Sequence, residues 1–309
     1  MALTHRLTLT GPDPTDPEDL LGSSLGVIFP DDVANQHGDA DHGLLYASPH
    51  LPRPIPLALA EVEDEADRRL WSHLLWNSSL LLAELIEAGT LGIDDGERGV
   101  APPVEGFDVS GLSVIELGAG TALPSIMAGL LGARRVVATD YPTPPVLKAL
   151  RRNITASVKE EFAPAGRFAA EEVLVAGHGW GELDTPLALE NKGASDRVLA
   201  ADCLWMPWQH ENLRRSVAWF LGDGEGARAW VVGAFHTTRD TVRAFFEKEA
   251  LAAVGLEVEY LWERDCDGRD REWAWDRGGE DVSARKRWLA VGVLRRIRKP
   301  AGEGEGRPW

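Results

Sequence analysis

The pattern of hydrophobic and polar positions changes near residue 66 of this chain. Residues 1–65 are rich in Pro, Gly, Asp and His, and the runs GPDPTDPEDL and ASPHLPRPIP predict extended or turn-forming backbone rather than regular elements. Between residues 66 and 89 apolar residues, Trp71 among them, recur at helical spacing. We predict an N-terminal extension, followed by a buried helix that is broken near residues 77–79 and stops at Gly89.

After residue 100, short β-branched runs alternate with longer amphipathic stretches, which is the pattern of βαβ units around a mostly parallel sheet. The amphipathic stretches predict helices over residues 122–131, 143–157, 209–220 and 238–253. The β-branched runs predict seven strands, over residues 113–117, 135–139, 171–175, 197–201, 228–235, 256–262 and 287–295.

The segment between the last two predicted strands, residues 264–286, is charged and lacks helical periodicity, so we expect a long loop there. A final strand that is reached without a crossover helix is expected to run antiparallel. The fold class that follows is α/β: a Rossmann-like, seven-stranded, mostly parallel sheet with helices on both faces and an antiparallel last strand. We expect this domain to span residues 66–297, between the extension at 1–65 and a disordered tail at 298–309.

A glycine turn in the stretch VIELGAGTALP directly follows the first predicted strand. Gly118 and Gly120 would let a nucleoside approach the backbone at the carboxyl edge of the sheet. Leu123 stands where a dinucleotide fingerprint has its third glycine, which disfavours NAD. Asp140 ends the second predicted strand, where a carboxylate accepts hydrogen bonds from both ribose hydroxyls. With Glu116 completing E-x-G-x-G, these positions favour S-adenosylmethionine, which has no pyrophosphate. The alternative is a tight turn without a ligand.

Composition limits the partners and the chemistry. The formal net charge of −17 disfavours general affinity for nucleic acid or for anionic membranes, and it favours a basic partner. No apolar run approaches the roughly 18 residues of a membrane span, and the start of the chain lacks the apolar core of a secretory signal. The two cysteines, Cys203 and Cys266, cannot build a closed zinc site of the cysteine type. We expect a cytosolic or nuclear compartment, of which we choose the cytoplasm, and no structural metal.

Four segments of the chain, taken in order, resemble one family: LLWNSS, VIELGAGTALPSIMAGLLGARRVVATDYP, GHGWGE and VLAADCLWMPWQHENL. Together they are similar to the seven-β-strand methyltransferases of the lysine-directed branch, over about residues 66–296. The most similar group is the fungal one first described as nicotinamide N-methyltransferases and later linked to N-terminal and lysine methylation of translation elongation factor 1-alpha. The resemblance implies an enzyme that uses S-adenosylmethionine.

The resemblance also implies which residues contact the cofactor. Trp180 would offer a ring edge or face to the adenine, and Trp76 would contact the cofactor from the predicted helix. Core packing is the alternative for both tryptophans. Ala201 is small and would matter mainly by leaving space. The full set carried over by motif is Trp76, Gly118, Ala119, Gly120, Asp140, Trp180 and Ala201.

An aromatic loop, residues 202–208, follows the fourth predicted strand at the open side of the cofactor. Lysine-directed relatives often present an Asp here, and Asp202 would act as the catalytic residue that orients the acceptor amine and assists the loss of its proton. Trp205 and Trp208 would form an apolar, cation-binding wall. The alternative is that Asp202 caps the helix that begins near Gln209, or holds a loop.

Three functional classes remain open. We predict an N-methyltransferase for a lysine or α-amino group of a basic protein, elongation factor 1-alpha in particular, because an acidic enzyme attracts such a partner. The alternative is a small-molecule N- or O-methyltransferase with a nicotinamide-like or secondary-metabolite acceptor, enclosed under an N-terminal lid. The third is an inactive binding protein or an NAD-dependent oxidoreductase, which the intact glycine turn and Leu123 disfavour. We expect His210 and His236 to be loop or packing residues rather than bases, and Cys203 to be a buried, inert cysteine.

Overall fold

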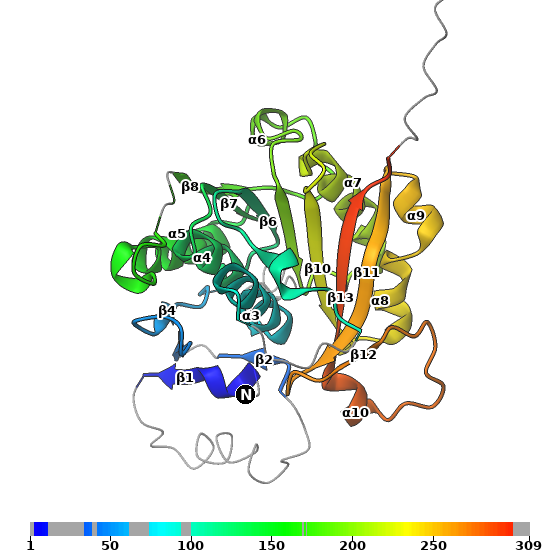
Figure 1. Cartoon of the computed structure of the whole chain (residues 1–309), viewed down its shortest axis with the longest axis horizontal. Helices are drawn as coiled ribbons and strands as arrows, with labels where there is room; N and C mark the ends of the chain where they lie inside the picture. The colour runs from blue at the N-terminus through cyan, green and yellow to red at the C-terminus, as the bar shows by residue number, and fades with distance from the viewer. Residues whose placement is uncertain are drawn as a thin grey trace, which may run out of the picture.

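A mostly parallel β-sheet forms the centre of the molecule (Figure 1). The computed structural model describes residues 3–11, 34–38, 42–61, 74–93, 100–168, 170 and 172–298. Within these residues the central sheet has eight strands in the order β12-β11-β13-β10-β9-β6-β7-β8. Their bounds are β6 Ser113–Leu117, β7 Arg135–Asp140, β8 Glu172–Gly177, β9 Arg197–Ala201, β10 Arg228–Ala234, β11 Leu256–Asp265, β12 Asp270–Glu272 and β13 Trp288–Arg296.

The strand directions confirm the expected fold class. The four pairs β6·β7, β6·β9, β7·β8 and β9·β10 are parallel, whereas β13 runs antiparallel to both of its neighbours, β10 and β11. The expectation of seven strands was wrong by one, because β12 lies in the segment expected to be a loop. Arg264 on β11 forms an ion pair at 2.7 Å with Asp270 on β12, and this pair closes a hairpin too short for a periodic pattern.

Helices cover both faces of the sheet, as expected (Figure 1). One face carries α3 (Asn77–Leu91), α4 (Leu123–Leu130) and α5 (Pro144–Ser157), and the other carries α6 (Pro186–Glu190), α7 (His210–Phe220), α8 (Arg239–Phe245) and α9 (Lys248–Ala252). The single helix expected over 238–253 is therefore two. Arg214 donates to the carbonyls of Ala244 and Phe245 at 3.2 Å each, so these carbonyls bond a guanidinium where the chain leaves α8.

Helix α3 ends later than the sequence pattern predicts. It starts at Asn77 and ends at Leu91, where Gly92 adopts a left-handed φ of 66°. Gly89 is not the stop: it lies inside the helix, where an added Cβ would come within 2.5 Å of the Val104 carbonyl oxygen. The expected continuation toward Trp71 falls on residues 62–73, outside the described residues.

The N-terminal extension contains regular elements, contrary to the expectation from its composition. Within the described residues, η1 (Leu3–Arg6) leads into β1 (Leu7–Thr10), which pairs with β3 (Gly43–Tyr46), and β3 pairs with β4 (Ile55–Leu57). A second pair joins β2 (Gln36–His37) to β5 (Leu75–Trp76). These strands are two to four residues long, and neighbours distant in the chain stabilise them, so a local pattern could not predict them.

Side chains from the main domain hold this extension in place. Asn153 on α5 accepts from the Ala58 amide at 2.7 Å and donates to the Ala58 carbonyl at 2.8 Å. Arg6 forms ion pairs with Glu84 at 2.6 Å and Glu87 at 3.0 Å, both on α3. The division of the chain at residue 65 stays a prediction.

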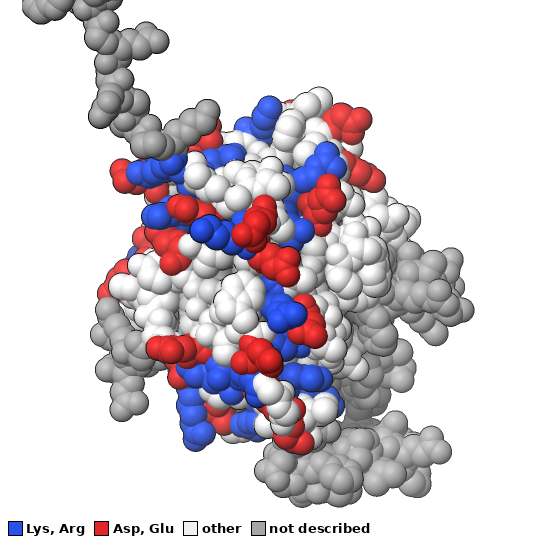
Figure 2. Space-filling view, turned by 90° about the vertical axis from the view of Figure 1, so that its right-hand side faces the viewer, with Lys and Arg blue, Asp and Glu red and all other residues white. Residues whose placement is uncertain are grey.

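Three short 3-10 helices and α10 complete the described elements: η2 (Val104–Phe107), η3 (Glu160–Phe162), η4 (Pro207–Gln209) and α10 (Val282–Lys286). The expected tail lies outside the described residues except for Arg298, which pairs with Glu225 at 2.8 Å. In the described part of the chain, no helix combines the length and apolar character of a membrane span. Figure 2 shows the right-hand side of the molecule, where basic and acidic side chains are interspersed, with basic ones most frequent in the lower part of the view.

Substitution of Gly89 by Ala tests how tightly α3 packs against η2. We expect Gly89→Ala to lower the free energy of unfolding by about 1–3 kcal/mol, because the new Cβ would meet backbone atoms of Val104 and Phe107 within 2.6 Å. Gly106→Ala is the matched control, since its Cβ would meet no atom within 4 Å. Chemical denaturation measures both, and equal stabilities of the two variants would contradict this account of the packing.

Candidate functional site

A cavity of about 920 Å³ opens at the carboxyl edge of the parallel strands. Its walls come from the turn after β6, the end of β7, the segment after β8, the end of β9 with the following loop, and the starts of α3 and α7. Ligands of open α/β sheets bind at this edge, because the loops that follow parallel strands converge there. The cavity is the candidate active site.

The structure brings every predicted site residue to this one cavity. The residues come from five separate segments of the chain, so their convergence is a property of the tertiary structure. The lining includes Trp76, Gly118, Ala119, Gly120, Asp140, Trp180, Ala201 and Asp202, together with Trp205 and Trp208. Trp76 differs from the expectation in one respect: it ends β5 and precedes α3 rather than lying within a helix. The roles assigned to these residues stay predictions.

Gly118 is required by the close packing of the turn. Its φ is 69°, and an added Cβ would lie 2.8 Å from the Cys203 sulfur and 3.1 Å from the Trp180 ring. Glu116 does not line the cavity. Instead, its buried carboxylate accepts from the backbone amide of Ser125 at 3.0 Å, in the first turn of α4. Burial raises the pKa of Glu116 to about 8. Glu116 therefore connects the end of β6 to the first turn of α4, on the side of the glycine turn that faces away from the cavity.

Asp140 is oriented by backbone amides at the end of β7. Its two carboxylate oxygens accept from Gly120 and Tyr141, each at 2.7 Å, which connects the acid directly to the glycine turn. Only 4% of Asp140 is exposed, and this burial raises its pKa to about 6 even though both amide bonds favour the ionised form. The carboxylate is ionised at neutral pH, which suits the predicted hydrogen bonds to two ribose hydroxyls.

Asp202 lines the cavity and connects three separate segments of the chain. One carboxylate oxygen accepts from the Ser78 hydroxyl at 3.0 Å and from the Ala234 amide at 3.3 Å, and both oxygens lie 3.2 Å from Nε2 of His236. The backbone of Asp202 has a φ of 59°, a strained value for a residue other than Gly. The alternative that Asp202 caps the helix near Gln209 is wrong, because that helix has no side-chain cap.

His236 links Asp202 to the wall of the cavity. Its ring lies 4.9 Å from the ring of Trp76. Burial lowers the pKa of His236, but the charge of Asp202 and the hydrogen bond to it outweigh this effect, so the pKa is raised overall. His210, by contrast, is buried and contacts the Leu204 carbonyl at 2.9 Å, as a packing residue does.

Several lining residues were not singled out by the sequence. His178 is 2% exposed, and burial lowers its pKa to about 4, so it is a neutral imidazole at neutral pH. Its Nε2 lies 3.0 Å from the Ser216 hydroxyl, and its buried Nδ1 has no hydrogen-bond partner. Tyr141 and Glu182 also line the cavity. A signal was present, since His178 and Glu182 belong to GHGWGE and Tyr141 directly follows Asp140.

The cavity has an anionic and aromatic lining. Asp140, Glu182 and Asp202 contribute carboxyl groups, and the described lining contains no Lys or Arg. The rings of Trp205 and Trp208 meet edge to face with centroids 6.4 Å apart, and Trp208 is 70% exposed at the mouth. Carboxylates and aromatic faces attract cations. This anionic and aromatic lining fits S-adenosylmethionine, whose sulfonium and ammonium groups are positive, and it also fits an amine acceptor.

The thiol of Cys203 lies in an environment that does not favour a thiolate. The thiol of Cys203 is buried and donates to the Leu117 carbonyl at 3.2 Å, and burial raises its pKa, so it is the inert cysteine that was expected. Among the described residues, no group of three His, Cys, Asp or Glu side chains is placed to hold a metal ion.

Comparison with known proteins indicates the same kind of enzyme as the lining of the cavity, a methyltransferase. A family model described as "Lysine methyltransferase" matches residues 60–249, which is more than half of the chain. Proteins named "Protein N-terminal and lysine N-methyltransferase EFM7" are similar to it: that of Candida glabrata is 32% identical over 47% of this chain and 48% of its own length. The Gibberella zeae protein is 29% identical over 63% of this chain and 70% of its own.

Other relatives are more distant. The EFM7 protein of Schizosaccharomyces pombe is 26% identical over 70% of this chain and 74% of its own length. The match spans about half the length of the Candida glabrata relative, so the substrates of whole relatives are not transferred here. A solved structure of a putative transferase from Pyrococcus horikoshii is 12% identical and covers 91% of this chain and 83% of that one, with a TM-score of 0.47, which is too low to bear on function.

The ionisation of Asp140 makes cofactor affinity depend on pH. The ionised carboxylate accepts two hydrogen bonds and the protonated one cannot, so we expect the affinity for S-adenosylmethionine to fall about tenfold per pH unit below about pH 6. Asp140→Asn should bind about tenfold or more weakly at pH 8 and lose this dependence. Isothermal titration from pH 5 to 8 measures both. Glu182→Gln is the control, and an Asp140→Asn profile like that of the wild type would contradict the assignment.

Proposed function

This chain belongs to the lysine methyltransferase family, and from that premise we propose that it methylates a lysine or α-amino group of a basic protein, in particular elongation factor 1-alpha. The chain is an S-adenosylmethionine-dependent methyltransferase, so the alternative of an NAD-dependent oxidoreductase is excluded. The acceptor protein and the acceptor amine are the parts that we propose.

The lining of the cavity carries the proposal. Methyl transfer to nitrogen brings a cationic sulfonium and an amine together, and both are favoured where carboxylates line the walls and the described lining residues include no Lys or Arg. When bound, S-adenosylmethionine supplies an electrophilic methyl group on its sulfonium. The residues of this chain then have two tasks, which are to orient the amine in line with that methyl group and to exclude water.

The acceptor amine must be neutral in order to attack. An α-amino group, with a pKa of about 7.7–8.0, is partly neutral at physiological pH, whereas lysine, at about 10.4, needs desolvation or a proton acceptor. Asp202 lies where it can orient the amine and assist the loss of its proton, with Trp205 as an apolar wall. His236, in contact with both Asp202 oxygens, holds this carboxylate in place.

Three observations support a protein as the acceptor. The formal net charge of −17 favours a basic partner, and the relatives described above carry protein methylation in their names. Trp208 stands largely exposed at the mouth, where it can contact a large acceptor. A translation factor as acceptor places the activity in the cytoplasm, which we include in the proposal.

Labelling with radioactive S-adenosylmethionine tests the acceptor directly. We expect the purified protein to label recombinant elongation factor 1-alpha, with the label located by mass spectrometry on a lysine or on the N-terminal amine. A lysate of the source organism, separated into protein and small-molecule fractions, is the parallel sample. Label confined to small molecules would overturn the proposal in favour of a small-molecule methyltransferase, and label on a different protein would correct the partner.

Substitution of Asp202 tests its proposed role in proton transfer. We expect Asp202→Asn to lower kcat about 100-fold or more, while the Kd for S-adenosylmethionine stays within about twofold. Because Asp202 also accepts from Ser78, the variant Ser78→Ala is the control that removes the structural bond and keeps the carboxylate. Equal losses of kcat in the two variants would assign Asp202 a structural role only.

A further inference from the structure

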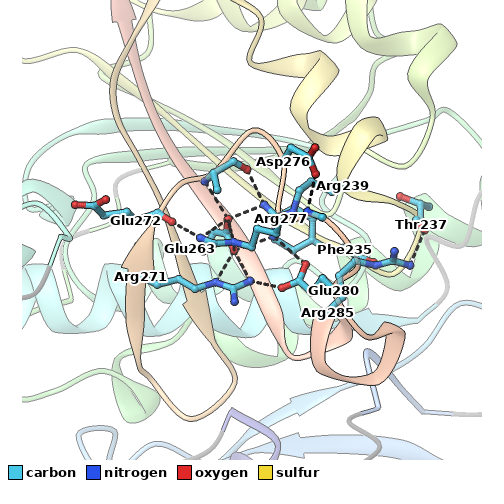
Figure 3. Close-up of polar contacts among 12 residues, drawn as sticks. Phe235, Thr237, Arg239, Glu263, Arg271, Glu272, Asp276, Arg277, Glu280 and Arg285 are labelled. Atoms are coloured by element: carbon cyan, nitrogen blue, oxygen red, sulfur yellow. Dashed lines mark hydrogen bonds and ion pairs between the residues drawn. The ribbon is translucent and has the colours of Figure 1, made fainter.

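A charged segment at the edge of the sheet is folded around one buried carboxylate. This segment, residues 270–286, runs from β12 through α10 and is called the arm below. Figure 3 shows Glu263 of β11 at the centre of a cluster of arginine side chains, two of which come from the arm. The side chain of Glu263 is fully buried.

Three guanidinium groups surround the Glu263 carboxylate. Arg239 at the start of α8 donates to both oxygens, at 2.6 and 3.0 Å. Arg271 donates at 2.7 Å and Arg277 at 3.2 Å, and both belong to the arm. Burial alone would raise the pKa of Glu263, but the three cations outweigh it and lower the pKa. A buried carboxylate without these partners would be strongly unfavourable, so the cluster fixes the arm to the sheet.

A second acid and an aromatic layer complete the attachment. Glu280 of the arm bridges Arg239 at 3.2 Å and Arg271 at 2.7 Å. The Arg239 guanidinium also lies over the Phe235 ring, 4.2 Å from its centroid, and the Trp273 ring of the arm stacks against Phe235. The inner side of the arm is therefore made of arginine and aromatic side chains that are already paired.

The outer side of the arm has the opposite character. Arg271, Arg277 and Arg285 donate to Glu263, Glu280 and backbone carbonyls, and these arginines are partly buried, as is Lys286. Every exposed ionisable side chain between residues 270 and 286 is acidic: Glu272, Asp276 and Asp281. Two large apolar side chains of the arm are exposed too, Trp275 at 48% and Val282 at 54%. Exposed apolar groups with acids around them are typical of a protein-binding surface.

The arm lies next to the candidate active site. Arg285 donates to the carbonyls of Phe235 at 3.2 Å and Thr237 at 3.4 Å. Between these two residues stands His236, whose ring contacts Trp76 in the cavity wall. On its other side the arm meets α8, where Arg243 donates to the Trp275 carbonyl at 3.5 Å. Helix α8 in turn contacts η4, which carries Trp208 at the mouth.

We propose that the outer side of the arm, with Trp275, Val282, Glu272, Asp276 and Asp281, is the docking surface for the folded, basic acceptor protein. This inference rests on the proposed function and adds where that protein binds. The charge of the exposed residues is complementary to a basic partner, and Trp275 is the kind of large apolar side chain that dominates binding energy at interfaces. The Glu263 cluster keeps the surface rigid, so that little conformational freedom is lost on binding.

Two substitutions in the arm test the docking surface, with recombinant elongation factor 1-alpha as the acceptor. We expect Trp275→Ala to raise KM for this protein about tenfold while kcat and the Kd for S-adenosylmethionine stay within about twofold. Glu272→Lys should raise KM about fivefold, and added salt should affect its KM less than that of the wild type, because one attractive charge is replaced by a repulsive one.

Matched controls lie elsewhere on the molecule. Tyr260→Ala removes another aromatic side chain, 43% exposed, from β11, and Asp223→Lys reverses a charge that is 91% exposed before β10. Both should leave KM unchanged. If the wild type methylates the protein and all four variants share its KM, the docking surface is wrong and the proposed function stands. If the wild type labels no protein at all, the proposed function fails and the docking surface fails with it.

Discussion

The carboxylate of Asp202 holds together three parts of the chain on which the active site depends. Its bonds reach Ser78 at the start of α3, Ala234 at the end of β10 and His236 beyond it, over sequence separations of 124, 32 and 34 residues. Because His236 also contacts Trp76, the same carboxylate positions one wall of the cavity. The strained backbone of Asp202 persists because these contacts fix its side chain from several directions. A group held so firmly is suited to orienting a reactive amine.

Three buried acidic residues, Glu116, Asp140 and Glu263, have different roles because their surroundings differ. Glu116 lies below the cavity, where burial raises its pKa to about 8 and it anchors the glycine turn to α4. Asp140 lies at the cavity wall, where amide donors orient it and its pKa is about 6. Glu263 is fully buried too, but three arginines keep it ionised. The environment of each carboxyl group, rather than its residue type, sets its pKa and its role. Glu116 connects the glycine turn to α4, Asp140 is placed to bind a ligand, and Glu263 attaches the arm to the sheet.

The acidic side chains of this protein are distributed unevenly relative to its basic ones. The described lining residues of the cavity include carboxylates but no Lys or Arg. In the arm, by contrast, the arginines form ion pairs or hydrogen bonds within the protein, and the exposed ionisable residues are acids. A sequence count shows only that acids outnumber bases by 17. The ion pairs determine where the excess negative charge is exposed.

The sequence alone determined most of the central domain, because seven of the eight strands described in its sheet have a local pattern. The strand at 197–201 and the position of Asp140 after a second strand follow from β-branched runs and from the spacing to the glycine turn. Eight candidate site residues were named on this basis and on the resemblance, and all of them line one cavity. Residues in one motif, such as His178 and Glu182, were within reach of the same reasoning.

Only the tertiary structure decided the features that depend on distant partners. The short strands of residues 1–61 and β12 exist through pairing with neighbours far along the chain or through a single ion pair, and neither leaves a periodic trace. The end of α3 at Leu91 is set by space, since Gly89 is needed where η2 approaches. The inward turn of the arm's arginines follows from one buried carboxylate, Glu263, that adjoins them only in the folded protein. Local patterns report what a segment prefers, whereas burial and charge pairing are decided by what the rest of the chain places beside it.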